Sequence, residues 1–150
     1  MDLLLTFIIY VTYMYIFITD IKSRIIPETG IVILIVAGFI KAVQNGNMEG
    51  YYIGMCSYQM PLLLLYMLED FFQRELIGFG DIKLMIGIGG ILTYRNMEEI
   101  LKFYHTLYFL SGITLIFLIP VFKYRKVKMD YIPFAPFIII SYIIRNYNLT

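Results

Sequence analysis

The stretch Leu3–Thr19 reads LLLTFIIYVTYMYIFIT and contains no charged residue. An α-helix needs about 20 apolar residues to cross the ~30 Å hydrocarbon core of a bilayer. The stretch lacks the basic amino-terminal region and the small-residue cleavage pattern of a secretory signal peptide. It therefore predicts a first transmembrane helix that is retained in the protein.

Five further apolar runs follow along the chain. They are Thr29–Val43, Tyr51–Leu68, Leu84–Tyr94, Tyr104–Phe122 and Tyr131–Ile144. Leu84–Tyr94 covers only ~17 Å as a helix, so part of Ile77–Lys83 must lie at membrane depth. Its glycines, Gly87, Gly89 and Gly90, predict close packing between helices. We expect one all-α membrane domain over residues 1–150, with about six transmembrane helices.

Composition agrees with a membrane protein. Of 150 residues, 60% are hydrophobic, against ~45–50% in soluble domains. The net charge of +1 gives no field that would favour nucleic acid as a partner. The single cysteine, Cys56, excludes an internal disulfide and a multi-cysteine zinc site. We expect Cys56 to be buried within the third span.

The distribution of basic residues predicts the orientation in the cell membrane. The loops after the first, third and fifth spans hold eight of the 12 basic residues. These are Lys22, Arg24, Arg74, Lys83, Lys123, Arg125, Lys126 and Lys128. The positive-inside rule places these loops in the cytosol and both termini outside.

Two aspartates lie on the predicted cytosolic side, where they can meet. Asp20 ends the first span and Asp81 begins the fourth. Gly78 and Gly80 precede Asp81 and permit backbone angles that present its carboxylate. Position alone would equally fit two ordinary helix-end aspartates.

Paired carboxylates in a poorly solvated setting cannot both ionise comfortably, so such a pair shares a proton. One carboxyl can then activate a water while the other protonates a leaving amine. This is the chemistry of peptide-bond hydrolysis, and it requires no metal or other cofactor.

Three ordered segments carry a family resemblance. They are Asp20–Pro27 (DIKSRIIP), Gly78–Leu84 (GFGDIKL) and Ile132–Phe137 (IPFAPF). Together they resemble the type IV prepilin peptidases, which are membrane aspartyl proteases of the G-x-G-D group. Glu28 stands where this family usually has Asn, and Ala135 where it usually has Gly.

The resemblance implies an aspartic endopeptidase that removes the short basic leader of a prepilin-like membrane protein at the cytosolic face. Asp20 and Asp81 would form the catalytic dyad, and Gly78 and Gly80 would shape the active-site loop. The zinc-binding cysteine module of many bacterial members is lacking. We therefore expect the short, peptidase-only form, and we expect no methyl transfer.

Four acidic residues on the predicted cytosolic side are candidates for binding the basic leader, because opposite charges steer encounter. They are Glu28, Glu69, Asp70 and Glu75. A solvated loop face would also account for each of them. The prolines and phenylalanine of the third segment are expected to fix the start of the last span beside the site.

Two alternative functions stay open. A small proton- or cation-coupled transporter would use both acids in a relay, but the first and last spans lack the polar stripe this needs. Proteases of the presenilin or signal-peptide-peptidase type resemble the chain less, because they carry the first aspartate in a Tyr-Asp pair within a helix. Membrane lipid and the substrate are the expected partners, and the sequence gives no oligomeric state.

Overall fold

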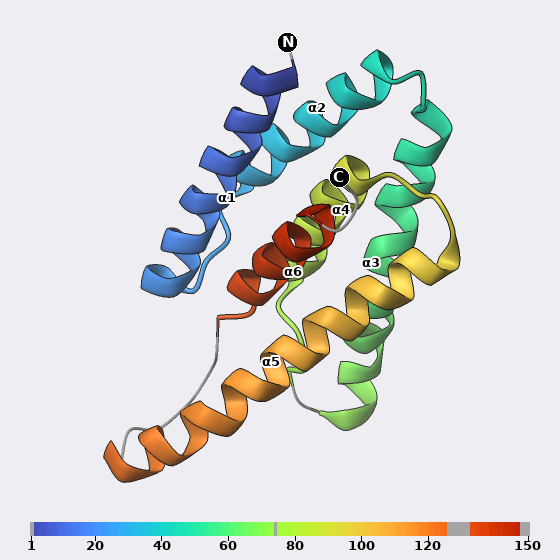
Figure 1. Cartoon of the computed structure of the whole chain (residues 1–150). Coiled ribbons are helices and arrows are strands. Elements are labelled where there is room, and N and C mark those ends of the chain that lie inside the picture. The colour runs from blue at the N-terminus through green and yellow to red at the C-terminus, as the bar shows by residue number, and fades with distance from the viewer. Residues whose placement is uncertain (1, 74, 126–132, 148–150) are drawn as a thin grey trace.

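The computed structural model describes residues 2–73, 75–125 and 133–147, and this part of the chain is all-helical (Figure 1). Its helices are α1 (Asp2–Ser23), α2 (Glu28–Gln44), α3 (Met48–Phe72), α4 (Phe79–Leu92), α5 (Met97–Arg125) and α6 (Ala135–Tyr147). The predicted all-α class and the six helices are confirmed for the described residues. The fourth helix begins at Phe79, inside the stretch expected to join that apolar run.

The short helix α4 forms the centre of the bundle. Ten of its 14 residues are buried, and it packs against α2, α3 and α6. Helix α1 packs on α2 and α6, and α5 packs on α6 (Figure 1). A helix that is apolar on all sides must be surrounded by other helices or lipid. The first turn of α4, which carries Asp81, is thereby anchored in the core.

Glycines allow α3 and α4 to approach closely. A Cβ added to Gly54 would lie 2.4 Å from the carbonyl oxygen of Gly89, and one added to Gly89 would lie 2.4 Å from that of Gly54. A Cβ on Gly87 would lie 3.1 Å from Leu34, and one on Gly90 would lie 2.8 Å from the ring of Tyr51. The packing role predicted for the glycines of α4 is confirmed.

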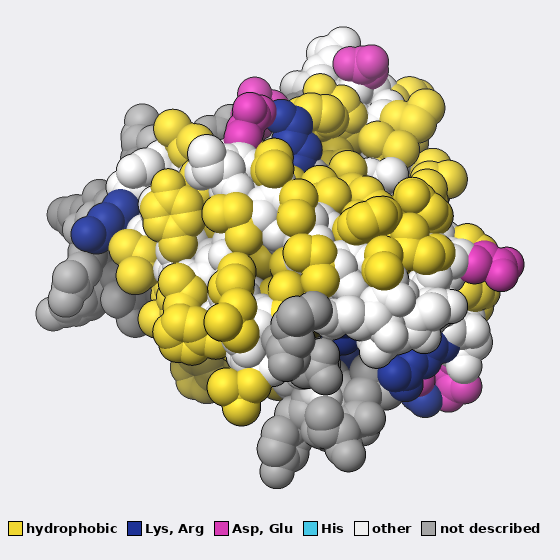
Figure 2. Space-filling model, turned by 90° about the horizontal axis from the view of Figure 1, so that it is seen from above, with side chains coloured by type: hydrophobic (Ala, Val, Ile, Leu, Met, Phe, Trp, Pro, Cys, Tyr) yellow, Lys and Arg dark blue, Asp and Glu magenta, His cyan; other side chains and the backbone are white. Residues whose placement is uncertain are grey.

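Among the described residues, two helices are long and apolar enough to cross a membrane, over Leu3–Ser23 of α1 and Met97–Phe117 of α5. A shorter apolar helix covers Ala135–Asn146. Large apolar side chains are exposed on the helices, among them Phe7 and Phe117. Figure 2 shows such side chains spread over a broad part of one face. The predicted membrane orientation stays a prediction.

The expectation that Cys56 is buried is wrong, because its side chain is exposed. Helix α3 turns Gly50, Gly54 and Tyr58 toward the core. At about 100° per residue, Cys56 lies two residues and some 200° away from Gly54. It therefore points away from α4.

Candidate active site

The helix ends bring Asp20 and Asp81 into one site. Asp20 lies near the end of α1 and Asp81 in the first turn of α4. Their exposed fractions are 5% and 9%, and the two carboxyl groups interact electrostatically. The two aspartates thus lie at buried helix ends whose carboxyl groups interact, and their joint role as a dyad stays a prediction.

The chain turns sharply just after Asp20. The carbonyl of Asp20 accepts a hydrogen bond of 2.8 Å from the N–H of Arg24, whose φ of 56° is left-handed. A left-handed residue commonly ends a helix because it turns the chain away from the axis. Pro27 then precedes α2, where a residue without an N–H costs no helical hydrogen bond.

The third sequence segment reaches Asp20 through the backbone. The N–H of Ala135 donates a buried hydrogen bond of 3.2 Å to Oδ2 of Asp20. Ala135 is the first residue of α6, and the N–H groups of a first helical turn have no partner within the helix and attract anions. Pro133 and Phe134 directly precede it, as expected beside the site, whereas Ile132 lies outside the described residues.

Sequence reasoning missed this hydrogen bond. A backbone N–H is present in every residue except proline, so the donor leaves no trace in residue type. For the same reason, Ala135 in place of the family's glycine keeps the donor. The sequence feature that could have indicated this hydrogen bond is the pair Pro133 and Pro136 on either side of the start of α6.

Two glycines shape the turn that carries Asp81. The N–H of Asp81 donates to the carbonyl of Gly78 at 3.0 Å. A Cβ on Gly78 would lie 3.1 Å from Oδ2 of Asp81, and one on Gly80 would lie 3.4 Å from Ile26. Oδ1 of Asp81 is buried and has no hydrogen-bond partner among the described residues. The glycines therefore leave room for the carboxylate on one side and for the turn after α1 on the other.

Glu28, a predicted leader-binding residue, pairs with Lys83 of α4. Its Oε1 lies 2.6 Å from Nζ of Lys83, and the Glu28 side chain is 78% exposed. The hydrogen bond and the positive charge of Lys83 lower the pKa of the Glu28 carboxyl below its ordinary value of 4.5. Nζ of Lys83 also lies 5.2 Å from the ring centre of Phe79. The pair joins the start of α2 to the helix that carries Asp81.

Glu69 lies in the last turn of α3 and is engaged by the loop that follows. Its Oε1 accepts hydrogen bonds of 2.8 Å from the N–H groups of both Leu76 and Ile77. Asp70 and Glu75 are exposed. Glu28 and Glu69 are thus each engaged by another segment of the chain.

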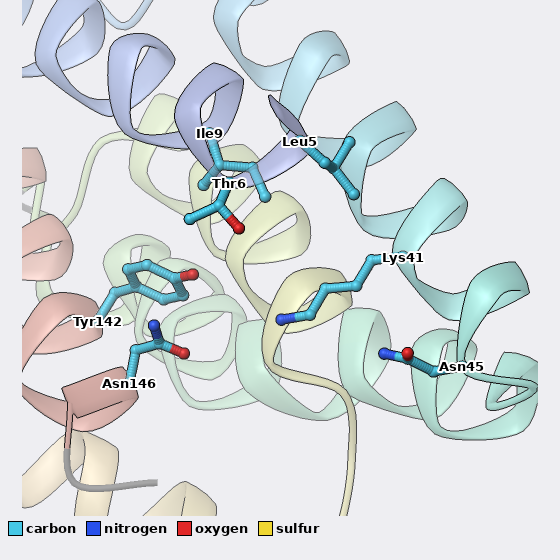
Figure 3. Close-up of a pocket in the computed structure, with 7 residues that line it drawn as sticks. All are labelled: Leu5, Thr6, Ile9, Lys41, Asn45, Tyr142 and Asn146. Atoms are coloured by element: carbon cyan, nitrogen blue, oxygen red, sulfur yellow. The ribbon is translucent and has the colours of Figure 1, made fainter. Parts of the chain in front are cut away.

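A separate cavity of about 250 Å³ lies at the opposite ends of α1, α2 and α6 (Figure 3). It is lined by Leu5, Thr6, Ile9, Lys41, Asn45, Tyr142 and Asn146. None of the predicted site residues borders it. Within the described ranges, no group of three or more His, Cys, Asp or Glu side chains is placed to hold a metal ion.

Comparison with known families gives a match to the type IV leader peptidase family over residues 7–122, more than three quarters of the chain. The matched part contains Asp20, Asp81 and the glycines before Asp81, while Pro133–Phe137 lies beyond it. No curated protein sequence and no solved structure matches the chain. On the extent of the family match, the chain belongs to the type IV leader peptidase family.

Proposed function

We propose that this protein is an aspartic endopeptidase that removes the short basic leader of a prepilin-like precursor, such as a pilin, pseudopilin or archaellin. Membership of a peptidase family makes it a protease of the leader-peptidase kind and favours this class over the transporter. The observation that supports the aspartic mechanism is that Asp20 and Asp81 are both buried and that their carboxyl groups interact electrostatically.

In the proposed mechanism the two carboxyl groups share one proton, because two like charges at short range in a poorly solvated site repel. The ionised carboxylate takes a proton from a water as it attacks the scissile carbonyl. The protonated carboxyl then protonates the leaving amine, so that the C–N bond breaks. The buried Oδ1 of Asp81 supports this role, since no hydrogen bond from the described residues occupies it.

The substrate is proposed to meet the protein within the cell membrane, with its leader in the cytosol. The apolar spans of α1 and α5 support a membrane location, and the basic-residue bias supports a multi-pass chain with cytosolic aspartates. Glu28, Asp70 and Glu75 give this end of the bundle negative charge that attracts a basic leader. Asp70 and Glu75 are the proposed direct contacts, because they are exposed in and just after the last turn of α3.

The decisive experiment measures leader cleavage of a prepilin-like protein from the same genome, in detergent. Wild type is compared with Asp20→Asn and Asp81→Asn, and with Glu49→Gln as a control that removes an exposed carboxylate from the first turn of α3. Each dyad variant should lose at least about 100-fold in rate, as expected when a general acid or base is lost. The control should retain kcat. Near-full activity in either dyad variant, in protein that is folded and inserted, would refute the dyad.

A further inference from the structure

Glu69 holds the loop that leads into the Asp81 turn. One oxygen of its carboxylate accepts N–H bonds from Leu76 and Ile77, both at 2.8 Å. The next residue, Gly78, is the N-cap of α4 and accepts the N–H of Asp81. Three consecutive residues therefore connect the Glu69 carboxylate to the turn that carries a dyad aspartate.

The local backbone explains why Glu69 can reach this loop. Helix α3 ends at Phe72, and Gln73 has a left-handed φ of 51° that reverses the chain. Glu69 is half-buried in the last turn of α3 and faces the returning chain. Hydrogen bonds to an ionised acceptor are stronger than those to a neutral one, and removing this acceptor would leave two N–H groups unpaired.

A weaker contact holds the other side of the turn. Lys83, two residues after Asp81, pairs with Glu28 at 2.6 Å. The Glu28 side chain is largely exposed, and exposed ion pairs contribute little because water screens them. The segment between Gly78 and Asp81 is thus fixed chiefly from the side of Glu69.

We propose that Glu69 is a positioning residue for the peptidase reaction, which fixes Leu76 and Ile77 and thereby the approach of Asp81 to Asp20. Its role is then to orient the dyad and not to contact the leader. Small displacements of reacting groups cost large factors in rate, so a carboxylate that immobilises this loop acts on kcat. The inference rests on the proposed function for its kinetic part only.

The kinetic test uses Glu69→Leu, Glu69→Gln and the control Glu49→Leu, which removes an exposed carboxylate from the first turn of the same helix. Glu69→Leu should lower kcat about tenfold or more and leave KM within about twofold of wild type. Glu69→Gln keeps an oxygen that accepts the same two N–H groups, so kcat should return to within about threefold of wild type. The control should leave kcat unchanged.

The opposite kinetic pattern overturns the proposal. If Glu69 bound the leader, Glu69→Leu and Glu69→Gln would raise KM equally, because both remove the charge, and kcat would stay near wild type. Should Glu69→Leu fail to fold, Glu69→Gln alone still decides. An unchanged KM supports positioning, and a raised KM contradicts it.

A second readout does not depend on activity. Amide hydrogen exchange at Leu76 and Ile77 should become faster in Glu69→Leu and stay slow in Glu69→Gln and Glu49→Leu, with α2 as an internal reference. Equal exchange in all variants would overturn the proposal. If the wild type cleaves no prepilin, the proposed function fails, while this measurement still decides whether Glu69 holds the loop.

Discussion

Asp20 lies at the carboxyl end of α1, whereas Asp81 lies at the amino end of α4. The carboxylate of Asp20 is held by a backbone N–H from α6, which is far away in sequence. The turn of Asp81 is held by its own glycine and by the loop just before it. One half of the site therefore depends on how the bundle is assembled, and the other depends on local chain geometry.

The largest loss of activity should follow from removing the N–H of Ala135, which holds the carboxylate of Asp20. Ala135→Pro deletes the N–H that Asp20 accepts. Proline is tolerated at the first position of a helix, so α6 should still form. Because a buried carboxylate loses its donor, kcat should fall by about 10- to 100-fold. Leader-cleavage kinetics and circular dichroism check the two expectations.

Ala135→Gly is the matched control for this variant, because glycine keeps the donor and is the residue usual in the family. It should cleave at near the wild-type rate. Equal losses in both variants would mean that the side chain at this position matters and the N–H does not.

A change in the packing of α4 tests whether the turn that carries Asp81 also depends on how the helices pack. In Gly89→Ala the new Cβ would meet the carbonyl oxygen of Gly54 at 2.4 Å, so α3 and α4 must separate. Overpacking of this kind costs about 1–3 kcal/mol. The melting temperature in detergent should fall. Gly112→Ala is the control, since no atom of the described part of the chain lies within 4 Å of its added Cβ, and alanine in a helix is favoured over glycine.

The contrast between local chain geometry and assembly of the bundle explains which features the sequence could predict. The six helices follow from runs of apolar residues, and the short fourth helix follows from the length of its run. The turn at Asp81 could be predicted because Gly78 and Gly80 stand next to the aspartate they serve. These features depend on neighbours in the chain.

The missed features depend on contacts that residue type does not reveal. Ala135 donates through its backbone, so its residue type gives no signal. Leader binding by Glu28 and Glu69 stays a prediction, but their partners within the chain were missed, because an acidic side chain does not reveal which partner the fold brings to it. Cys56 was placed in the core because its span is apolar, yet only the packing of α3 decides which face is buried.

A smaller loss of kcat is expected when the turn that carries Asp81 is disturbed directly. In Gly78→Ala the added Cβ would lie 3.1 Å from Oδ2 of Asp81, so the carboxylate must shift by a few tenths of an ångström. We expect kcat to fall by about tenfold, because the reacting group is displaced while the helix start is kept. Kinetics at saturating substrate measure this.

Gly80→Ala serves as the comparison for Gly78→Ala. Its Cβ would lie 3.4 Å from Ile26, an ordinary contact, and would point away from the carboxylate. A loss in Gly80→Ala as large as that in Gly78→Ala would show that the turn after α1, and not the carboxylate, is what the glycines accommodate.

The smallest loss of kcat should come from breaking the exposed ion pair between Glu28 and Lys83, which joins the start of α2 to α4. Glu28→Gln removes the charge that Lys83 binds at 2.6 Å, and screening by water limits the expected loss of kcat to about twofold. Because Lys83 lowers the pKa of Glu28, the pair stabilises the fold fully above the ordinary value of 4.5. This stabilisation is lost as pH falls below that value, toward the lowered pKa. The difference in melting temperature between wild type and Glu28→Gln should therefore shrink below about pH 4.5, whereas a difference that stays constant with pH would show that the ion pair contributes nothing.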